Sequence, residues 1–429
     1  MTRVLMGVYF YPRGGSAHAT RALVRELRRQ GVEVTLVSGS RSDLGGGTDA
    51  REFYAGLDPV AVDFAPALAS PAPLHFEDGA GTAPIHGSFE DRPGAADAVL
   101  ASLDDEAFEL QVEAWQRALS GAASEGVDLL YLHHLTPLNE AAARAFPDRP
   151  VVGHLHGTEL LMMEQIAAGP PPGWTHAEAW MKRMCRWAAA CARIVVADRR
   201  GRDRAAALLG LERERFACIP SGVDRHFEPR PIDRGAHWRR HLGAEPPGTV
   251  FVSVGRFTAV KRLPLLIEAF ADARGRAASP ASLVLVGGHP GEWEGEYPRE
   301  TVARLGAGDV FLAGWHPHSE LPDFFNAADA LVHASAREQF GQVLVEAMAC
   351  ERPPIAIDAA GPASIVANGE TGWLVPPEDA GALAAAILAA VEAPEERRRR
   401  GRNARAAALE RYSWERIGAR AAALLASVD

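Results

Sequence analysis

Short apolar runs alternate with amphipathic segments along most of the chain. Residues 4–11 form a continuous apolar run, which is typical of a strand covered on both faces of a parallel sheet. Residues 17–30 follow with apolar positions at helical spacing and end at Gly31, and residues 32–37 form a second apolar run. A strand, a glycine-containing turn, a helix and a strand in this order predict a right-handed crossover unit.

The same alternation continues through both halves of the chain. The further strands that it predicts lie at 128–133, 151–155, 193–197 and 216–219 in the first half, and at 250–254, 283–286, 310–313, 330–333 and 355–357 in the second. Helical patterns fall between these runs and at the end of the chain. This pattern predicts the α/β class, with two Rossmann-like doubly wound domains in tandem. The carboxyl ends of their sheets are expected to face each other across a cleft.

Prolines and glycines divide the two halves. We expect an N-terminal domain over 1–228, a linker over 229–248 and a C-terminal domain over 249–411. Residues 412–429 are expected to form a helix that packs back on the N-terminal domain. Residues 44–105 show no sustained period, so we expect an irregular insertion there, either an acceptor flap or a disordered loop.

Composition narrows the class of protein. The chain has 429 residues, of which 47% are hydrophobic and 23% charged, as in a globular protein of more than one domain. A net charge of -10 argues against a nucleic-acid binder. No apolar run approaches the ~18 residues of a transmembrane segment. The four cysteines form no C-x-x-C pair, which favours reduced thiols and a cytoplasmic location.

The stretch from Arg337 to Ala349 carries the strongest chemical signal. It places Glu338 in a loop, Gly341 at a turn, and Glu346 on an apolar helix that begins near Gln342. A helix N-terminus has unpaired N–H groups and a positive dipole end that suit a phosphate, and carboxylates accept hydrogen bonds from sugar hydroxyls. The stretch therefore predicts a nucleotide-sugar site. The alternative is a pair of surface acids beside a helix start.

Two further features follow predicted strands in the first half. Gly14 and Gly15 lie after the first strand, where open α/β sheets bind ligands, although a glycine pair alone is a weak signal. His154 and His156 share one side of an extended strand. No third ligand is evident at a convincing spacing, so a zinc site is the weakest interpretation.

His133 and His134 end another predicted strand. They are equally well explained as acceptor contacts or as structural residues. The segment His316-Pro317-His318 precedes a helix, and the sequence assigns no chemistry to it.

These motifs carry a family resemblance. Together with Ile219–Asp224, and with Gly255-Arg256 followed by Lys261, they resemble the retaining glycosyltransferases of the GT-B fold. Within that fold the chain is similar to the sucrose-synthase-like and mannosyltransferase-like family, the glycosyl transferases group 1. The resemblance covers nearly the whole chain.

The resemblance implies roles for individual residues. Glu346 would accept the ribose hydroxyls of the nucleotide, Glu338 would bind the transferred sugar, and Arg256 with Lys261 would bind the donor diphosphate. His156 would contact the transferred sugar at the reacting centre. Backbone groups near the donor would come from Gly15, Phe340, Gly341, Gln342 and Val343, and acceptor contacts from Gly14, His133, His134 and His154.

The resemblance implies a hexosyltransferase that moves a sugar from a nucleoside-diphosphate sugar, with UDP favoured and ADP or GDP open. We find no Asp-x-Asp signature, so we expect no metal and no other cofactor. The expected acceptor is a small molecule; a peripheral membrane contact and a homodimer stay open. The alternatives are a nucleotide-sugar epimerase or hydrolase on the same scaffold, and a non-catalytic sugar-nucleotide binding protein.

Overall fold

The chain divides into two compact units. Unit 1 comprises Met1–Pro220 and Trp414–Asp429, and unit 2 comprises Ser221–Ser413. The computed structural model describes residues 2–12, 14–45, 47–70, 72, 81–91, 97–123, 126–288, 294–335, 337–359 and 361–428.

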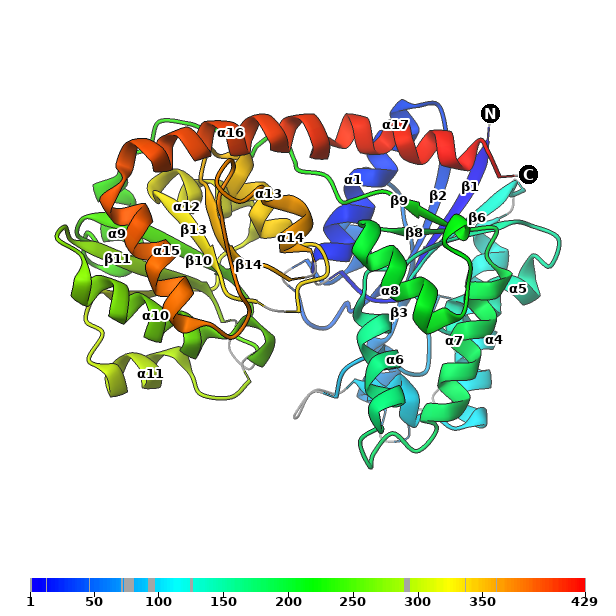
Figure 1. Cartoon of the computed structure of the whole chain (residues 1–429). Helices are drawn as coiled ribbons and strands as arrows, with labels where there is room; N and C mark the ends of the chain where they lie inside the picture. The colour runs from blue at the N-terminus through cyan, green and yellow to red at the C-terminus, as the bar shows by residue number, and fades with distance from the viewer. Residues whose placement is uncertain are drawn as a thin grey trace. The chain divides into compact units, whose positions relative to one another are not determined.

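Unit 1 is built on a parallel sheet of seven strands in the order β3-β2-β1-β6-β7-β8-β9 (Figure 1). Its strands are β1 (Arg3–Val8), β2 (Glu33–Ser40), β3 (Val60–Asp63), β6 (Leu129–His133), β7 (Val151–His154), β8 (Arg193–Val196) and β9 (Phe216–Cys218). Strand β1 is central, with Val4 opposite Val34 of β2 and Leu129 of β6. The strand order reverses between β1 and β6. A separate small sheet pairs β4 (Gly87–Ser88) with β5 (Ala98–Val99).

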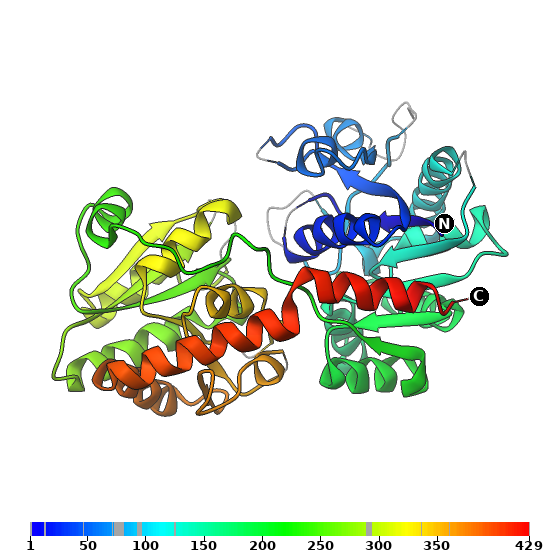
Figure 2. The ribbon, with the colours of Figure 1, turned by 90° about the horizontal axis from the view of Figure 1, so that it is seen from above.

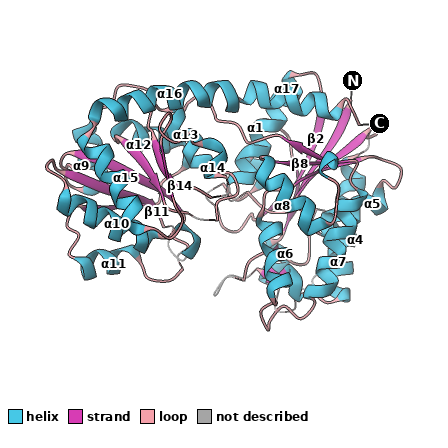
Figure 3. Ribbon diagram, viewed as in Figure 1, coloured by secondary structure: helices cyan, strands magenta, loops and turns pink. Residues whose placement is uncertain are grey.

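Helices cover both faces of this sheet (Figure 3). The helices of unit 1 are α1 (Gly15–Arg29), α2 (Ala50–Phe53), α3 (Ala65–Ala69), α4 (Asp105–Ala122), α5 (Pro137–Ala145), α6 (Thr158–Ala168), α7 (Ala177–Ala190), α8 (Arg199–Leu209) and α17 (Trp414–Leu425). Because successive strand residues point to opposite faces, Leu5 packs in one apolar core with Trp115, whereas Met6 packs in a second with Leu23.

The C-terminal helix α17 packs on α1 within unit 1, and the two helices lie side by side in Figures 1 and 2. Ile417, Ala421 and Leu425 are buried against the core that holds Leu27. Gly418 allows the close approach, because a Cβ atom at that position would lie 2.5 Å from Cβ of Glu26.

The expectation of an irregular insertion over 44–105 is wrong in part. Val60–Asp63 forms β3, which pairs with β2 at the edge of the main sheet. The described residues Phe64 and His86 are also fully buried. A four-residue edge strand leaves too short a pattern to detect in a segment rich in proline and glycine. The patch from His75 to Gly79 lies outside the described residues.

Unit 2 is built on a second parallel sheet, in the order β12-β11-β10-β13-β14-β15. Its strands are β10 (Thr249–Gly255), β11 (Ala281–Gly287), β12 (Val310–Gly314), β13 (Ala330–His333), β14 (Pro354–Ile357) and β15 (Trp373–Val375). Its helices are α9 (Arg234–Leu242), α10 (Leu263–Arg276), α11 (Pro298–Leu305), α12 (Leu321–Ala327), α13 (Gln342–Ala349), α14 (Pro362–Ile365), α15 (Ala380–Glu392) and α16 (Pro394–Tyr412). Here the strand order reverses between β10 and β13.

The start of unit 2 lies before the expected linker. Val223 donates its backbone N–H to the carbonyl of Tyr412 at the end of α16. Helix α9 falls within the expected linker 229–248, yet its Trp238 is buried in the core of unit 2 against Phe324. The segment is therefore a folded part of this unit.

All the strand pairs are parallel, and both units alternate strands with helices, which confirms the predicted α/β class and its two Rossmann-like domains. None of the described helices is long and apolar enough to cross a membrane.

The packing of α17 on α1 predicts a specific loss of stability. Ile417→Ala should lower the free energy of unfolding by about 2–5 kcal/mol, because it removes a buried side chain and leaves a cavity. Leu409→Ala is the control, since Leu409 is 44% exposed and its truncation should cost under about 0.5 kcal/mol. Urea denaturation measures both; equal losses would contradict the buried packing of α17.

Candidate functional site

Polar residues gather where the strand order of each sheet reverses. In unit 1, Gly14 follows β1 and His133 ends β6; in unit 2, Arg256 follows β10 and His333 ends β13. Ligands of open α/β sheets bind outside the carboxyl ends of the strands at this reversal. Each unit therefore holds a candidate site at its own switch point.

In unit 2, Lys261 and Glu338 form a close ion pair. Lys261 ends a 3₁₀ turn just before α10, and its Nζ atom donates a hydrogen bond to Oε2 of Glu338 at 2.5 Å. His333, at the end of β13, places Nε2 3.3 Å from the same oxygen. Lys261 follows β10, whereas His333 ends the adjacent strand β13 and Glu338 follows that strand.

This environment sets the charge of Glu338. Burial raises the pKa of the carboxyl group, but the Lys261 ammonium and the His333 ring outweigh burial and lower the pKa below its usual value. Burial likewise lowers the pKa of His333. Glu338 is therefore an ionised acceptor held by a fixed cation at neutral pH.

Two glycines shape the loop between Glu338 and α13. Gly341 caps α13 with a φ of 97°, a left-handed conformation, and a Cβ atom there would lie 2.7 Å from Cδ1 of Leu344. Gly361 donates its N–H to the carbonyl of Glu338 at 2.9 Å, and a Cβ atom at Gly361 would lie 2.3 Å from the carbonyl oxygen of Phe340. The sequence did not single out Gly361.

The start of α13 is held in place on one side. Gln342 donates from Nε2 to the carbonyl of Gly222 at 2.8 Å, which ties the motif Ile219–Asp224 to the helix start. The first N–H groups of a helix, here those of Gln342 and Val343, have no intrahelical acceptor. They remain suited to an anion beside the Lys261–Glu338 pair.

Glu346 is buried on α13, and it contacts a histidine that the sequence left without a role. Its carboxylate oxygen Oε1 lies 2.7 Å from Nε2 of His318, and Glu346 is only 2% exposed. Phe227 packs edge-on against the His318 ring. His318 belongs to the segment to which the sequence assigns no chemistry, and the structure places it against a candidate site residue. Motif spacing could not predict this contact, because the two residues are far apart in sequence and only the folding of the sheet brings them together.

Arg256 stands apart from the pair. Its side chain is exposed, and no ion pair joins it to Glu338 among the residues that the structure describes. Gly255 precedes it with a φ of 153°, and a Cβ atom at Gly255 would lie 3.4 Å from Cε of Lys261. The chain thus passes close to Lys261 while Arg256 faces solvent.

In unit 1, four histidine rings form one cluster at the ends of β6 and β7. The ring centroids of His154 and His156 are 4.3 Å apart, and those of His134 and His156 are 4.5 Å apart. Nδ1 of His133 lies 2.8 Å from Nε2 of His156. The structure therefore brings together all four histidines that the sequence named.

Three of these rings, those of His133, His154 and His156, are held neutral. Burial lowers the pKa of His133 and of His156 well below the usual value, and neighbouring histidines lower it further. Burial also lowers the pKa of His154 to about 3. The hydroxyl oxygen of Tyr131 lies 3.0 Å from Nδ1 of His154.

A buried carboxylate contacts two residues of the cluster. Glu159 is fully buried at the start of α6, accepts the backbone N–H of His156 at 2.9 Å, and lies 3.4 Å from Nδ1 of His134. His134 has a φ of 66°, an uncommon conformation outside glycine that is often kept at functional sites. No motif or spacing in the sequence pointed to Glu159.

The structure supplies a third nitrogen beside His154 and His156. Ring nitrogens of His133, His154 and His156 lie within 4.8 Å of one another, so the spacing argument missed a possible metal ligand. The His133 and His154 rings, however, lie at only 18° and 22° to His156. Lone pairs in near-parallel stacked rings do not converge on one ion, as tetrahedral zinc requires.

A second group of potential ligands lies in unit 2. Asp224, His226 and His318 bring their ligand atoms within 4.8 Å of one another. They lie beside Glu346, which contacts His318 directly.

The glycine turn of unit 1 leaves open space. Gly14 precedes α1 with a φ of 155°, and a Cβ atom at Gly14 or Gly15 would meet no atom within 4 Å. A ligand could approach the backbone of this turn closely.

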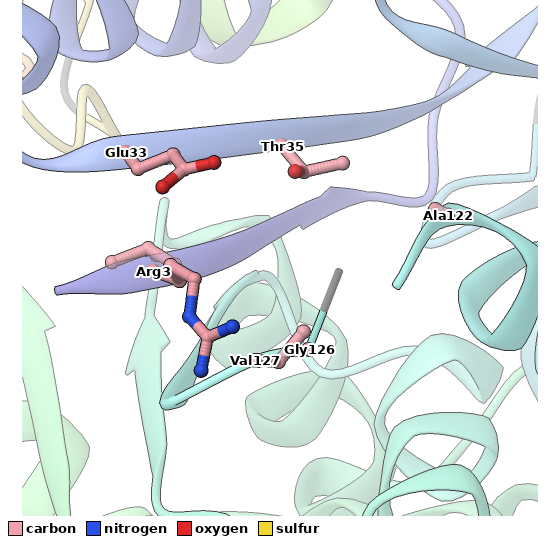
Figure 4. A pocket seen from close by; sticks show the side chains of 7 residues that line it. Arg3, Glu33, Thr35, Ala122, Gly126 and Val127 are labelled. Carbon is pink, nitrogen blue, oxygen red and sulfur yellow. The ribbon is translucent and has the colours of Figure 1, made fainter. Parts of the chain in front are cut away.

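The small cavity in Figure 4 lies at the other end of the sheet in unit 1. Its volume is about 80 Å³, and Arg3, Glu33 and Gly126 are among its lining residues. These residues adjoin the amino ends of β1, β2 and β6, away from the histidine cluster.

Comparison with protein families covers both units. Residues 236–407 match the family described as glycosyl transferases group 1, and residues 90–227 match glycosyltransferase family 4. Both matches are glycosyltransferase families, which confirms the resemblance to the GT-B glycosyltransferases. The first of these matches takes in the ion pair, Glu346 and α13, and the second takes in the histidine cluster.

Curated relatives of this GT-B chain share about a third of the aligned residues. The D-inositol 3-phosphate glycosyltransferase of Acidothermus cellulolyticus is 35% identical over 186 residues, which cover 42% of this chain and 41% of that protein. A second such enzyme, from Catenulispora acidiphila, is 32% identical over 218 residues, covering 49% and 50%. The chain thus spans about half the length of the curated relatives it matches.

Solved structures match the GT-B fold over the whole chain. The Anabaena protein HepE in complex with UDP has a TM-score of 0.71 at 21% identity, covering 99% of this chain and 100% of that chain. Sucrose-phosphate synthase from Thermosynechococcus elongatus has a TM-score of 0.69 at 21% identity, covering 99% and 98%. At this identity the likeness establishes the fold.

The neutral cluster predicts acid sensitivity. As pH falls below about 6.5, the unfolded chain protonates His154 while the folded chain does not until pH approaches about 3, so the free energy of unfolding falls over this window by up to about 1.4 kcal/mol per pH unit. His154→Asn should reduce this loss. Urea denaturation at about pH 7 and about pH 5 measures it.

His176→Asn is the control for that measurement, since His176 lies outside the cluster. An unchanged pH dependence in the His154 variant would contradict a neutral His154 in the folded chain.

Proposed function

We propose that this protein is a retaining glycosyltransferase that moves a sugar from a nucleoside-diphosphate sugar to a small acceptor. The observation that carries the proposal is the Lys261–Glu338 ion pair beside the start of α13, with Glu346 buried on the same helix. A fixed cation, unpaired helix N–H groups and two carboxylates match the phosphate and hydroxyl groups of such a donor.

Different residues bind different parts of the donor. Glu346 accepts ribose hydroxyls, and Glu338, ionised through Lys261, accepts hydroxyls of the transferred sugar. Lys261 and Arg256 bind the diphosphate together with backbone N–H groups of Phe340, Gly341, Gln342 and Val343. In unit 1 we propose that His156 contacts the transferred sugar and that Gly15 approaches the donor. Gly14 and His154 are the proposed acceptor contacts, whereas His133 and His134 are buried and would support the cluster instead.

UDP is the favoured nucleotide. The Anabaena protein HepE was solved with UDP and with UDP-glucose, and it shares the fold over the whole chain. D-inositol 3-phosphate is the first acceptor to test, because the curated relatives are named for it. We place the reaction in the cytoplasm, where the four free cysteines stay reduced.

The proposed reaction keeps the anomeric configuration through same-face attack. The bond between the anomeric carbon and the diphosphate oxygen breaks, the acceptor oxygen bonds to the same face, and the acceptor proton passes to the leaving diphosphate. Lys261 and Arg256 stabilise the charge that develops on the leaving group, a role that a metal ion fills in other enzymes. We therefore propose a metal-independent reaction.

Incubation of UDP-glucose with D-inositol 3-phosphate tests the function, with NMR reading the anomeric configuration of the product. A product with the donor's configuration supports the proposal. Free sugar or an epimer indicates the hydrolase or epimerase alternative, and binding without turnover indicates a sugar-nucleotide binding protein. A covalent glycosyl-enzyme trapped from donor alone would replace same-face attack with double displacement.

The cation pair has a measurable part in turnover. Arg256→Ala with Lys261→Ala should lower kcat about 10²–10³-fold, because the leaving diphosphate loses fixed positive charge. Arg256→Ala alone should lower kcat without disturbing the fold, since Arg256 is exposed. Arg239→Ala, which removes a surface ion pair with Glu245 in the same unit, is the control. Full activity in the double variant would refute the assignment.

Glu346 should determine nucleotide affinity. UDP should raise the melting temperature of the wild-type protein more than ADP or GDP does, since a ligand that binds only the folded state stabilises it. Glu346→Gln should weaken UDP binding by roughly tenfold, because a hydrogen bond to a charged acceptor is stronger than one to a neutral acceptor. Glu245→Gln on the surface is the control. Equal affinity for UDP and for 2′,3′-dideoxy-UDP in the wild type would argue against ribose recognition.

A further inference from the structure

A buried threonine connects the first helix to the histidine cluster. Thr20 lies on α1 with no exposed surface, and its hydroxyl group donates a hydrogen bond to the carbonyl of Ser16 at 2.8 Å. The same oxygen lies 3.4 Å from Nε2 of His133. Because the hydroxyl hydrogen is directed at Ser16, the oxygen has only lone pairs to offer to His133.

This arrangement fixes where His133 carries its hydrogen. A neutral imidazole has one N–H donor and one bare nitrogen. Thr20 can only accept, so Nε2 of His133 carries the hydrogen and Nδ1 is bare. The Nδ1 atom lies 2.8 Å from Nε2 of His156. That short separation requires a hydrogen between the two nitrogens, and His156 must supply it.

The same reasoning then applies to His156. Its Nε2 atom donates to His133, so its own Nδ1 atom is the bare nitrogen, directed away from His133. His156 is partly exposed, and Nδ1 makes no hydrogen bond to a described residue. Its backbone N–H is held by Glu159 at 2.9 Å, which limits rotation of the residue.

We propose that Thr20 and His133 are positioning residues that hold His156 as the Nε2–H tautomer, with Nδ1 presented as a neutral hydrogen-bond acceptor. The group that binds His156 is therefore a hydroxyl or another N–H or O–H donor. A sugar carboxylate or a phosphate is excluded from this position, because it would face a lone pair. The substrate part of this inference rests on the proposed function and limits the sugar to one with a free hydroxyl group at that point.

The opposing arrangement is a metal ion between the rings. His133, His154 and His156 would then direct bare nitrogens to one point, although His133 and His154 lie nearly parallel to His156. A hydrogen bond accounts for the 2.8 Å separation of His133 and His156 without an ion. The two arrangements give different protonation patterns at Nε2 of His156.

Nitrogen-15 NMR of the histidine rings in the full chain separates them. The wild-type protein should show His156 as the Nε2–H tautomer, unchanged between about pH 8 and about pH 6, with the resonances assigned by their loss in His156→Gln. Thr20→Val keeps the shape of the side chain but removes the acceptor for His133. It should convert His156 to a mixture of tautomers, whereas Thr20→Ser should keep the wild-type spectrum.

Three results would overturn the proposal: an Nδ1–H tautomer of His156 in the wild type, an unchanged His156 spectrum in Thr20→Val, or loss of the His156 Nε2–H signal on addition of Zn²⁺ alone. Matching melting temperatures for Thr20→Val and Thr20→Ser show that both variants fold.

The consequence for turnover is measured separately. If the proposed transfer reaction is correct, Thr20→Val should lower kcat/KM for the donor roughly five- to tenfold, the worth of one hydrogen bond, and Thr20→Ser should restore it. The NMR result does not depend on activity. The expected tautomer without transfer activity would therefore overturn the proposed function but not the positioning role of Thr20 and His133. Transfer activity with the other tautomer would overturn the positioning role but not the proposed function.

Discussion

In each sheet the strand order reverses once, and this reversal decides where chemistry can take place. Connections from the two central strands leave in opposite directions there, so the carboxyl ends of β1 and β6, and of β10 and β13, are not covered by a shared crossover. The histidine cluster of unit 1 and the Lys261–Glu338 pair of unit 2 occupy equivalent places for this reason.

The two sites offset the free-energy cost of removing polar side chains from water in opposite ways. In unit 2 a carboxylate stays charged because Lys261 donates to it at 2.5 Å, and breaking such a partly buried pair leaves a charge without its partner. In unit 1 the rings of His133, His154 and His156 avoid the cost by staying neutral. One hydrogen bond joins His133 to His156, and Thr20 and Tyr131 contact further ring nitrogens. Fixed charge therefore belongs to the half proposed to bind the diphosphate, and neutral hydrogen bonding to the other half.

Periodicity predicted most of the framework, because long apolar strands flanked by glycine leave clear patterns. The strand at 330–333 has the predicted bounds. Strand β3 and the helix Thr158–Ala168 escaped detection: the first is too short, and the second has apolar residues all around and no single apolar stripe.

The sequence predicted several residues of the candidate site but not the contacts between them. Glu338 and Lys261 were both named from motifs, but their pairing depends on the order of strands β10 and β13, which spacing does not encode. Thr20, Glu159 and His318 act through partners distant in sequence. A buried threonine on an apolar helix face looks like any small core residue until His133 is seen beside it.

The contact between His318 and Glu346 adds a constraint on any ligand at α13. Glu346 is almost fully buried, so its carboxylate needs hydrogen-bond donors whether or not a nucleotide is bound. His318 provides one at Oε1, 2.7 Å away. A ribose hydroxyl that binds Oε2 adds to this contact, whereas one that takes Oε1 has to displace the ring from a place where Phe227 also packs. The first arrangement keeps the contact with His318, so we expect the imidazole to orient the carboxylate and the ribose of the proposed donor to bind Oε2.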